Sequence, residues 1–131
     1  MKRLFTAAML LVITTISANA QLVINELMQS NVECTMDDIN EFPDSWVELY
    51  NPTNAPINLQ DYWLGTKADG SKSWQLPNKT IKSKGYVIIY CDKEDAEDHP
   101  YHANFRLDSD KESNLYLSRA TRLLTVLKAF P

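Results

Sequence analysis

Apolar and polar residues alternate with a period of two in several short segments of the chain, which is the pattern of half-buried β-strands. The clearest is the segment WVELY, in which two aliphatic residues alternate with an aromatic–acid–aromatic stripe. Because successive side chains of a strand point to opposite faces, we expect Val47 and Leu49 to face a core. The stripe itself, Trp46, Glu48 and Tyr50, is predicted to be exposed. It is the candidate binding surface, since exposed aromatic side chains stack on sugars or anchor protein partners.

Strand-like segments recur about every ten to fifteen residues, with turn signals rather than amphipathic helices between them. The segment 86–91 is apolar on both faces, which indicates a central strand. This spacing predicts an all-β fold built as an antiparallel sandwich or barrel. Further strands are expected at residues 22–28, 57–64, 74–76, 104–107 and 115–117.

Three segments are less regular. The apolar positions of 57–64 change phase near Asp61, which predicts a β-bulge there. Residues 29–43 form a polar, acidic connection that is long for a compact domain, and such loops are either functional or mobile. Residues 119–131 fit a final strand or a short helix, and the pattern leaves both open.

The N-terminus has the order of a secretory signal peptide. Met1-Lys2-Arg3 is basic, residues 4–16 are apolar apart from threonines, and a small-x-small pattern ends at Ala20. We therefore expect a signal peptide at residues 1–20, cleavage near Ala20, and a secreted, periplasmic or cell-surface protein. No cysteine stands at the cleavage point to carry a lipid anchor. No later segment has the ~20 apolar residues of a membrane helix, so no membrane span is expected.

A single domain is expected at residues 21–131, because a chain of this length buries roughly 65% of its unfolded surface without help from metals. The chain has 131 residues and a net charge of -4, and the loss of Lys2 and Arg3 would make it more negative by two. Nucleic-acid affinity comes mainly from Lys and Arg that neutralise phosphates. An acidic domain without a basic stripe is therefore a poor candidate for nucleic-acid binding.

Cys34 and Cys91 are the two cysteines of the chain. In an exported protein such a pair favours one disulfide. It would close a loop of about 57 residues and stabilise the fold by roughly 4 kcal/mol. The alternative is that the thiols never meet and Cys91 packs as a small hydrophobic residue. The sequence leaves both interpretations open.

Two acidic clusters raise the question of a calcium site, because calcium prefers several carboxylate oxygens. The first cluster, at residues 92–98, offers weak candidate ligands but lacks the glycine and the final glutamate of an EF-hand loop. For both clusters a solvated loop is the favoured interpretation. The candidate ligands of the first cluster are Asp92, Glu94, Asp95 and Asp98, and the second cluster comprises Asp37, Asp38, Glu41 and Asp44.

His99 and His102 are the only histidines, and a zinc ion would need Cys91 and nearby carboxylates as further ligands. Their spacing alone is weak support for a metal. No Gly-x-Ser-x-Gly segment marks a nucleophile, and the three glycines of the chain cannot form a phosphate-binding loop. We therefore expect no metal, no cofactor and no catalytic residue, and a protein that is not an enzyme.

Several segments, taken together and in order, resemble the lamin tail domain as it occurs in bacterial secreted proteins. They span residues 22–118 and read LVINELMQSN, DSWVELYNPTNAPINLQDYWLG, WQLPNKTIKSKGYVIIYCD, HANFRLDS and NLYLS. The resemblance implies an immunoglobulin-like β-sandwich that acts as a non-catalytic interaction domain. The expected partner is a protein or a cell-surface glycan, bound through a sandwich face or loops.

The resemblance leaves two alternatives for function. In bacterial exported proteins the domain often stands beside a larger one, including kinase-like domains similar to spore-coat protein H. The chain would then be the N-terminal accessory module of a larger, truncated enzyme. The second alternative is a calcium-dependent adhesion module that uses the acidic cluster after the 86–91 strand.

The chain departs from the family pattern at three places. Asp61 and Lys84 stand where glycine is common, and Asp tolerates the left-handed backbone better than most residues. Residues 120–122 lack the glycine-containing turn that leads into another strand. We therefore expect one or more late strands to be absent or altered, and the domain to be truncated at its C-terminal end.

Overall fold

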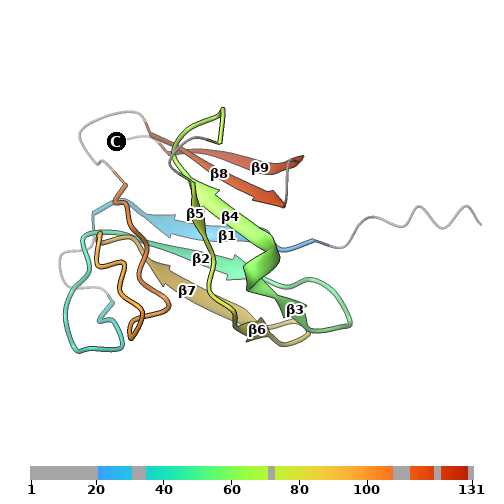
Figure 1. Ribbon diagram of the computed structural model, residues 1–131, viewed down its shortest axis with the longest axis horizontal. Coiled ribbons are helices and arrows are strands. Elements are labelled where there is room, and N and C mark those ends of the chain that lie inside the picture. The colour runs from blue at the N-terminus through green and yellow to red at the C-terminus, as the bar shows by residue number, and fades with distance from the viewer. Residues whose placement is uncertain (1–20, 31–34, 71–72, 108–112, 120–121, 130–131) are drawn as a thin grey trace, which may run out of the picture.

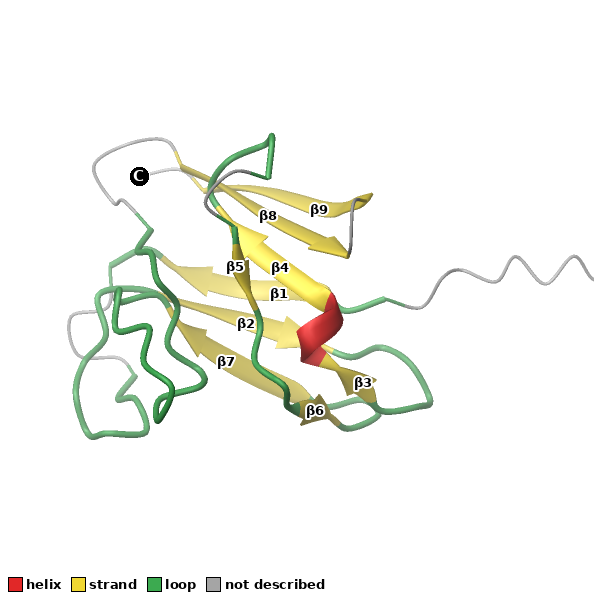
Figure 2. Ribbon diagram, viewed as in Figure 1, coloured by secondary structure: helices red, strands yellow, loops and turns green. Residues whose placement is uncertain are grey.

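Two antiparallel sheets face each other in the computed structural model, which describes residues 21–30, 35–70, 73–107, 113–119 and 122–129 (Figure 1). The first sheet has the order β1–β2–β7, and the second has the order β5–β4–β8–β9. A short pair, β3–β6, closes one end of the molecule (Figure 2). The strands are β1 Val23–Met28, β2 Trp46–Tyr50, β3 Ile57–Asn58, β4 Tyr62–Gly65, β5 Trp74–Gln75, β6 Thr80–Ile81, β7 Tyr86–Tyr90, β8 Ser113–Arg119 and β9 Arg122–Ala129.

This architecture confirms the predicted all-β antiparallel sandwich, and most predicted strands lie within one or two residues of the observed ones. The expected strand at 104–107 is wrong, because this segment makes only an isolated bridge between Asp92 and Arg106. β7 is also not a central strand, since β2 lies between β1 and β7. In the last segment the strand interpretation is correct, because β9 pairs antiparallel with β8 along its length. A late strand is thus present at residues 122–129, while the expected truncation at the C-terminal end of the domain stays a prediction.

The phase change at Asp61 arises from a 3-10 turn rather than from a β-bulge. Leu59–Asp61 form the turn η1, and the Asn58 side chain caps it by accepting a hydrogen bond from the Gln60 amide at 2.9 Å. Side chains of a 3-10 turn do not alternate between two faces as those of a strand do. After Leu59 the next residue that faces the core is therefore Tyr62, and not Asp61 as in a continuous strand. Asp61 is absent from the described residues with positive φ, which means that it does not replace a left-handed glycine.

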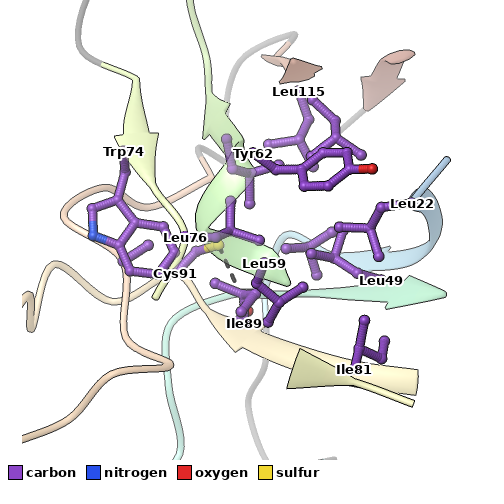
Figure 3. Packing of buried hydrophobic residues seen from close by; sticks show 14 of the residues in the cluster. Leu22, Leu49, Leu59, Tyr62, Trp74, Leu76, Ile81, Ile89, Cys91 and Leu115 are labelled. Carbon is purple, nitrogen blue, oxygen red and sulfur yellow. Dashed lines mark hydrogen bonds between the residues drawn. The ribbon is translucent and has the colours of Figure 1, made fainter. Parts of the chain in front are cut away.

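The core lies between the two larger sheets, where side chains from both meet (Figure 3). Val47 and Leu49 are fully buried, as the alternation of the WVELY segment predicts. Each large aliphatic side chain removed from water contributes about 1.5–3 kcal/mol. Residues at the centre of the core include Leu22, Leu49, Leu59, Tyr62, Leu64, Ile89, Leu115 and Leu117.

Two buried polar side chains hold the ends of the central strand β2. Ser45 precedes β2, and its hydroxyl donates to the Cys91 carbonyl at 2.8 Å and accepts from the Leu107 amide at 3.0 Å. Asn51 follows β2, and its side-chain amide donates to the carbonyls of Ala55 at 2.8 Å and Ile81 at 3.2 Å. Because buried polar groups are costly unless they are hydrogen-bonded, these two residues fix where the loops leave the sheet.

Long loops gather at the Ser45 end of the first sheet. The connection before β2 and the segment that follows β7 lie side by side there (Figure 1). Within the described ranges, no helix has the length and apolar character needed to cross a membrane. The sandwich therefore offers two kinds of surface for function, the outer faces of its sheets and this loop-covered end.

Candidate functional site

The outer face of the first sheet carries an aromatic pair. In β2 and β7, Tyr50 lies opposite Tyr86, and their rings stack with centroids 4.6 Å apart. Tyr86 is 58% exposed and Tyr50 is half-buried, so the pair presents an aromatic surface to water mainly through Tyr86. Such surfaces bind sugar rings or the apolar parts of protein partners.

A polar pair lies next to the tyrosines on the same face. Glu48 is two residues before Tyr50 in β2, and its carboxylate accepts a hydrogen bond of 2.7 Å from the Asn25 amide on β1. The Glu48 side chain is half-buried, and Asn25 is exposed. We call Tyr50, Tyr86, Glu48 and Asn25 the tyrosine face. It combines an aromatic platform with hydrogen-bonding groups.

The expected exposure of Trp46 is wrong, although Trp46 shares the outer face with Glu48 and Tyr50. Its side chain is only 6% exposed, and its strand neighbours are Met28 on β1 and Tyr90 on β7. Trp46 begins β2 at the loop-covered end of the sheet, where the neighbouring loops gather (Figure 2). The position along the strand therefore decides its burial, and strand phase alone could not predict it.

A second surface lies on the other sheet of the sandwich. An open groove of about 420 Å³ is lined by Trp63 of β4, Gln75 of β5 and Arg119 of β8, together with Gln60 and Asp61 of η1. Trp63 pairs with Gln75 across the strands. The groove offers one aromatic ring with polar side chains around it, which makes it a rival binding surface to the tyrosine face.

The loop-covered end brings together a histidine and several carboxylates. The His102 ring is fully buried, with Nε2 at 2.7 Å from an Asp38 oxygen and Nδ1 at 2.6 Å from an Asp92 oxygen. A Glu94 oxygen lies 3.9 Å from Nδ1. Asp37 is only 8% exposed and also lies in this group. We call His102, Asp37, Asp38 and Asp92 the His102 cluster.

When both carboxylates are ionised, the two short contacts need a positively charged ring. A neutral imidazole has one N–H and one lone pair, so it can donate to only one of two carboxylates. Burial by itself lowers the pKa of His102, but the hydrogen bonds and negative charges of Asp38 and Asp92 outweigh it and raise the pKa above its ordinary value. Burial and the charges of Asp38 and Asp37 likewise raise the pKa of the neighbouring Tyr90.

The short contact between His102 and Asp92 fits a shared proton rather than a metal. One ligand atom each of Asp37, Asp92 and His102 lie within 4.8 Å of one another. Two ligand atoms that are each about 2.1 Å from one tetrahedral ion would be separated by roughly 3.4 Å. The Nδ1–oxygen distance is 2.6 Å, which is the length of a charge-assisted hydrogen bond.

The four calcium candidates do not converge in the described part of the chain. Asp92 accepts from His102 and from the Glu94 amide, and Asp95 accepts from the Trp74 indole at 3.1 Å. Asp98 is exposed and lies 3.8 Å from His99. These carboxylates bind different neighbours instead of a common centre.

The second acidic cluster divides in the same way. Asp37 organises its own loop, because its carboxylate accepts the amides of Ile39 and Glu41. Asp38 contacts His102, and Asp44 lies 3.3 Å from Arg106 on the surface. Only Asp37 and Asp38 thus approach the first acidic cluster.

Cys91 is a fully buried thiol at the end of β7, and burial raises its pKa strongly. Its sulfur lies 3.8 Å from the Ile89 carbonyl oxygen. Cys34 lies outside the described residues, so both interpretations of the cysteines, a disulfide or two separate thiols, stay open predictions.

A family model described as Lamin Tail Domain matches residues 15–127 of the chain. A comparison with curated proteins found no significant match.

Proposed function

Because the chain belongs to the lamin tail domain family, a family of non-catalytic immunoglobulin-like domains, we propose that it is a binding module rather than an enzyme. The proposed binding surface is the tyrosine face, and the proposed ligand is a cell-surface glycan. The observation that carries this proposal is the exposed Tyr86 ring, stacked on the half-buried Tyr50 beside the polar pair Glu48–Asn25.

The chemistry of this face matches a sugar. The axial C–H groups of a sugar ring pack against a flat aromatic surface, and the free face of Tyr86 provides one. Sugar hydroxyls both donate and accept hydrogen bonds, so they complement a carboxylate and an amide. The proposed role of Trp46 changes accordingly, because a buried indole supports the sheet and does not touch a ligand.

Glycan-array binding of the wild type, a Tyr50→Ala/Tyr86→Ala variant and a Trp63→Ala variant tests the proposal. We expect the double variant to lose roughly 5- to 150-fold in apparent affinity, because the stacking of a flat ring on an aromatic side chain is worth about 1–3 kcal/mol for nucleic-acid bases, and we take a sugar ring to be comparable. The Trp63→Ala variant, which alters the rival groove, should bind like the wild type. Loss of binding only in Trp63→Ala would place the ligand in the groove. Unchanged binding in a folded double variant would reject the tyrosine face.

We further propose that the protein works outside the cytoplasm, on the basis of the signal-peptide pattern at residues 1–20. N-terminal sequencing of the protein from the culture medium or the periplasm tests this. A mature chain that begins near Gln21 is expected, and a cytoplasmic protein that retains Met1 would contradict export.

The alternative is an accessory role within a longer, kinase-like polypeptide, which would use the same tyrosine face. Sequencing of the coding region beyond the codon for Pro131 distinguishes this role from that of a stand-alone binding module. A continuing frame with kinase-like motifs favours the accessory role. In that case the tyrosine face would bind the substrate or the surface on which the enzyme acts.

A further inference from the structure

We propose that the His102 cluster is a pH-sensitive latch, in which a buried imidazolium holds the loop before β2 against the segment that follows β7. The latch joins residues that are far apart in the sequence, since Asp38 and His102 are separated by 64 positions. In Figure 1 the two loops run side by side at one end of the sandwich. This role is independent of the tyrosine face.

The first side of the latch is the compact loop 37–41. Its backbone is closed by a hydrogen bond of 2.8 Å from the Asp37 amide to the Glu41 carbonyl. The Asp37 carboxylate accepts the amides of Ile39 at 3.0 Å and Glu41 at 2.8 Å. Asp38 projects from this loop toward His102, so the loop moves with Asp38 as one unit.

The second side of the latch is fixed to the sheet. His102 forms a parallel bridge with Tyr90, and the amide of Ala103 donates to the Tyr90 carbonyl at 2.8 Å. The His102 ring lies against the Tyr90 ring at a centroid distance of 5.0 Å. Asp92 lies two residues after the end of β7, and its side chain is only 8% exposed. The imidazole is therefore held in place from the sheet side.

Among the described residues, the titratable groups that face His102 are four carboxylates, one tyrosine and one histidine. Asp37 and Asp38 face it from the loop before β2, and Tyr90, Asp92 and Glu94 face it from β7 and the segment beyond. The histidine is His99, whose ring meets the His102 ring edge-on at 5.5 Å. The surroundings thus favour a positive charge on His102.

Loss of one ring proton to water turns one of the two contacts into a repulsion between lone pairs. The Asp38 carboxylate is 44% exposed, whereas that of Asp92 is 8% exposed. Water can solvate Asp38 but not Asp92, so we expect Nε2 to lose the proton and the Asp38 contact to open. The loop 37–41 is then released, while Nδ1–H remains bound to Asp92.

The direction of the pH dependence follows from the raised pKa of His102. Protonation is favoured in the folded protein, so the latch is closed and fully stabilising below the unfolded-state pKa of about 6.5. Its contribution is lost as the pH rises through the higher folded-state pKa. Each pKa unit between the closed and open forms corresponds to about a tenfold change in the closing equilibrium.

NMR titration of the His102 ring tests the latch in a His99→Gln variant, which leaves His102 as the sole histidine. We expect a pKa above 6.5, the ordinary value for histidine. Asp38→Asn should lower the pKa of His102, whereas the control Asp98→Asn, at a carboxylate that contacts His99, should leave it unchanged. A pKa at or below 6.5, or one that Asp38→Asn does not change, would overturn the proposal. A pKa of His102 that changes when a chelator is added would also overturn the proposal, because the positive charge in the cluster would then belong to a metal.

Amide hydrogen exchange of the same full-length protein tests the release of the loop. Protection at Ile39 and Glu41, corrected for the intrinsic pH dependence of exchange, should fall as the pH rises through the pKa of His102. It should fall about tenfold for each unit of pKa shift, and protection at Leu49 should stay constant. In Asp38→Asn the protection of the loop should be low at every pH. Loop protection that does not change with pH would contradict the latch even if His102 is protonated.

Discussion

Asn51 shows how a single residue fixes the local structure after β2. Its side-chain amide donates to the carbonyls of Ala55 at 2.8 Å, Lys82 at 3.1 Å and Ile81 at 3.2 Å, which share its two hydrogens. Its carbonyl oxygen accepts the Thr53 amide at 2.9 Å. The Asn51 side chain is fully buried, so its amide has no access to water and depends on these partners for its hydrogen bonds.

The Asn51→Asp substitution keeps the shape of the side chain but turns the donor into an acceptor. We expect it to lower the free energy of unfolding by about 3 kcal/mol, because a buried carboxylate would face three carbonyl oxygens. Urea denaturation at neutral pH measures the loss. The control Asn54→Asp, at an exposed position in the same turn, should change the free energy by less than about 0.5 kcal/mol. Equal effects at the two positions would contradict this role for Asn51.

At the level of elements, the turn before β7 is held in a backbone conformation that its sequence does not favour. Lys84 has a φ of 57°, in the left-handed region that favours glycine. The next residue, Gly85, has no room for a side chain, since an added Cβ would lie 2.9 Å from the Lys82 carbonyl oxygen. Lys84 thus stands at a position where glycine would be less strained.

We expect Lys84→Gly to raise the free energy of unfolding by up to about 1 kcal/mol. It relieves roughly 1–2 kcal/mol of left-handed strain, which the greater backbone entropy of glycine in the unfolded chain partly offsets. The lost bond from the Lys84 ammonium to the Pro52 carbonyl is exposed and contributes little. Thermal melting of Lys84→Gly tests this expectation, with Lys82→Gly as the control. Because φ of Lys82 is not positive, the control relieves no left-handed strain. A variant Lys84→Gly that melts below the wild type would contradict the strain.

The elements also show what sequence patterns can predict. Alternation placed Val47 and Leu49 in the core correctly because burial on one face of a strand leaves a period of two. The same pattern could not place Tyr86 beside Tyr50, since β7 is apolar on both faces and gives no phase. The turn η1 was predicted as a bulge because both produce the same change of phase.

At the scale of the whole molecule, the remaining sites depend on contacts between distant segments. The His102 cluster joins a loop before β2 to a loop after β7, and the tyrosine face joins three strands, with Tyr50 and Tyr86 36 residues apart. Sequence patterns describe neighbours along the chain, so each acidic cluster looked like a separate solvated loop. The strand spacing and the family resemblance both predicted a sandwich, but only the pairing of the strands in the structure brings these side chains together.

The sandwich separates its two proposed roles in space. The tyrosine face lies on the open side of the first sheet, while the His102 cluster lies at the loop-covered end beside Tyr90. Trp46 lies between them on β2, and it is buried. A ligand on the tyrosine face and a proton on His102 should therefore act without a shared residue.

Chemical-shift mapping tests the central claim most directly. The isotope-labelled full-length protein is titrated with an oligosaccharide that is positive on the array, and amide and side-chain shifts are followed. We predict the largest shifts at Tyr50, Tyr86 and the neighbouring Glu48 and Asn25, because these groups would touch the sugar. Largest shifts at Trp63 and Arg119, with the tyrosine face unchanged, would contradict the account.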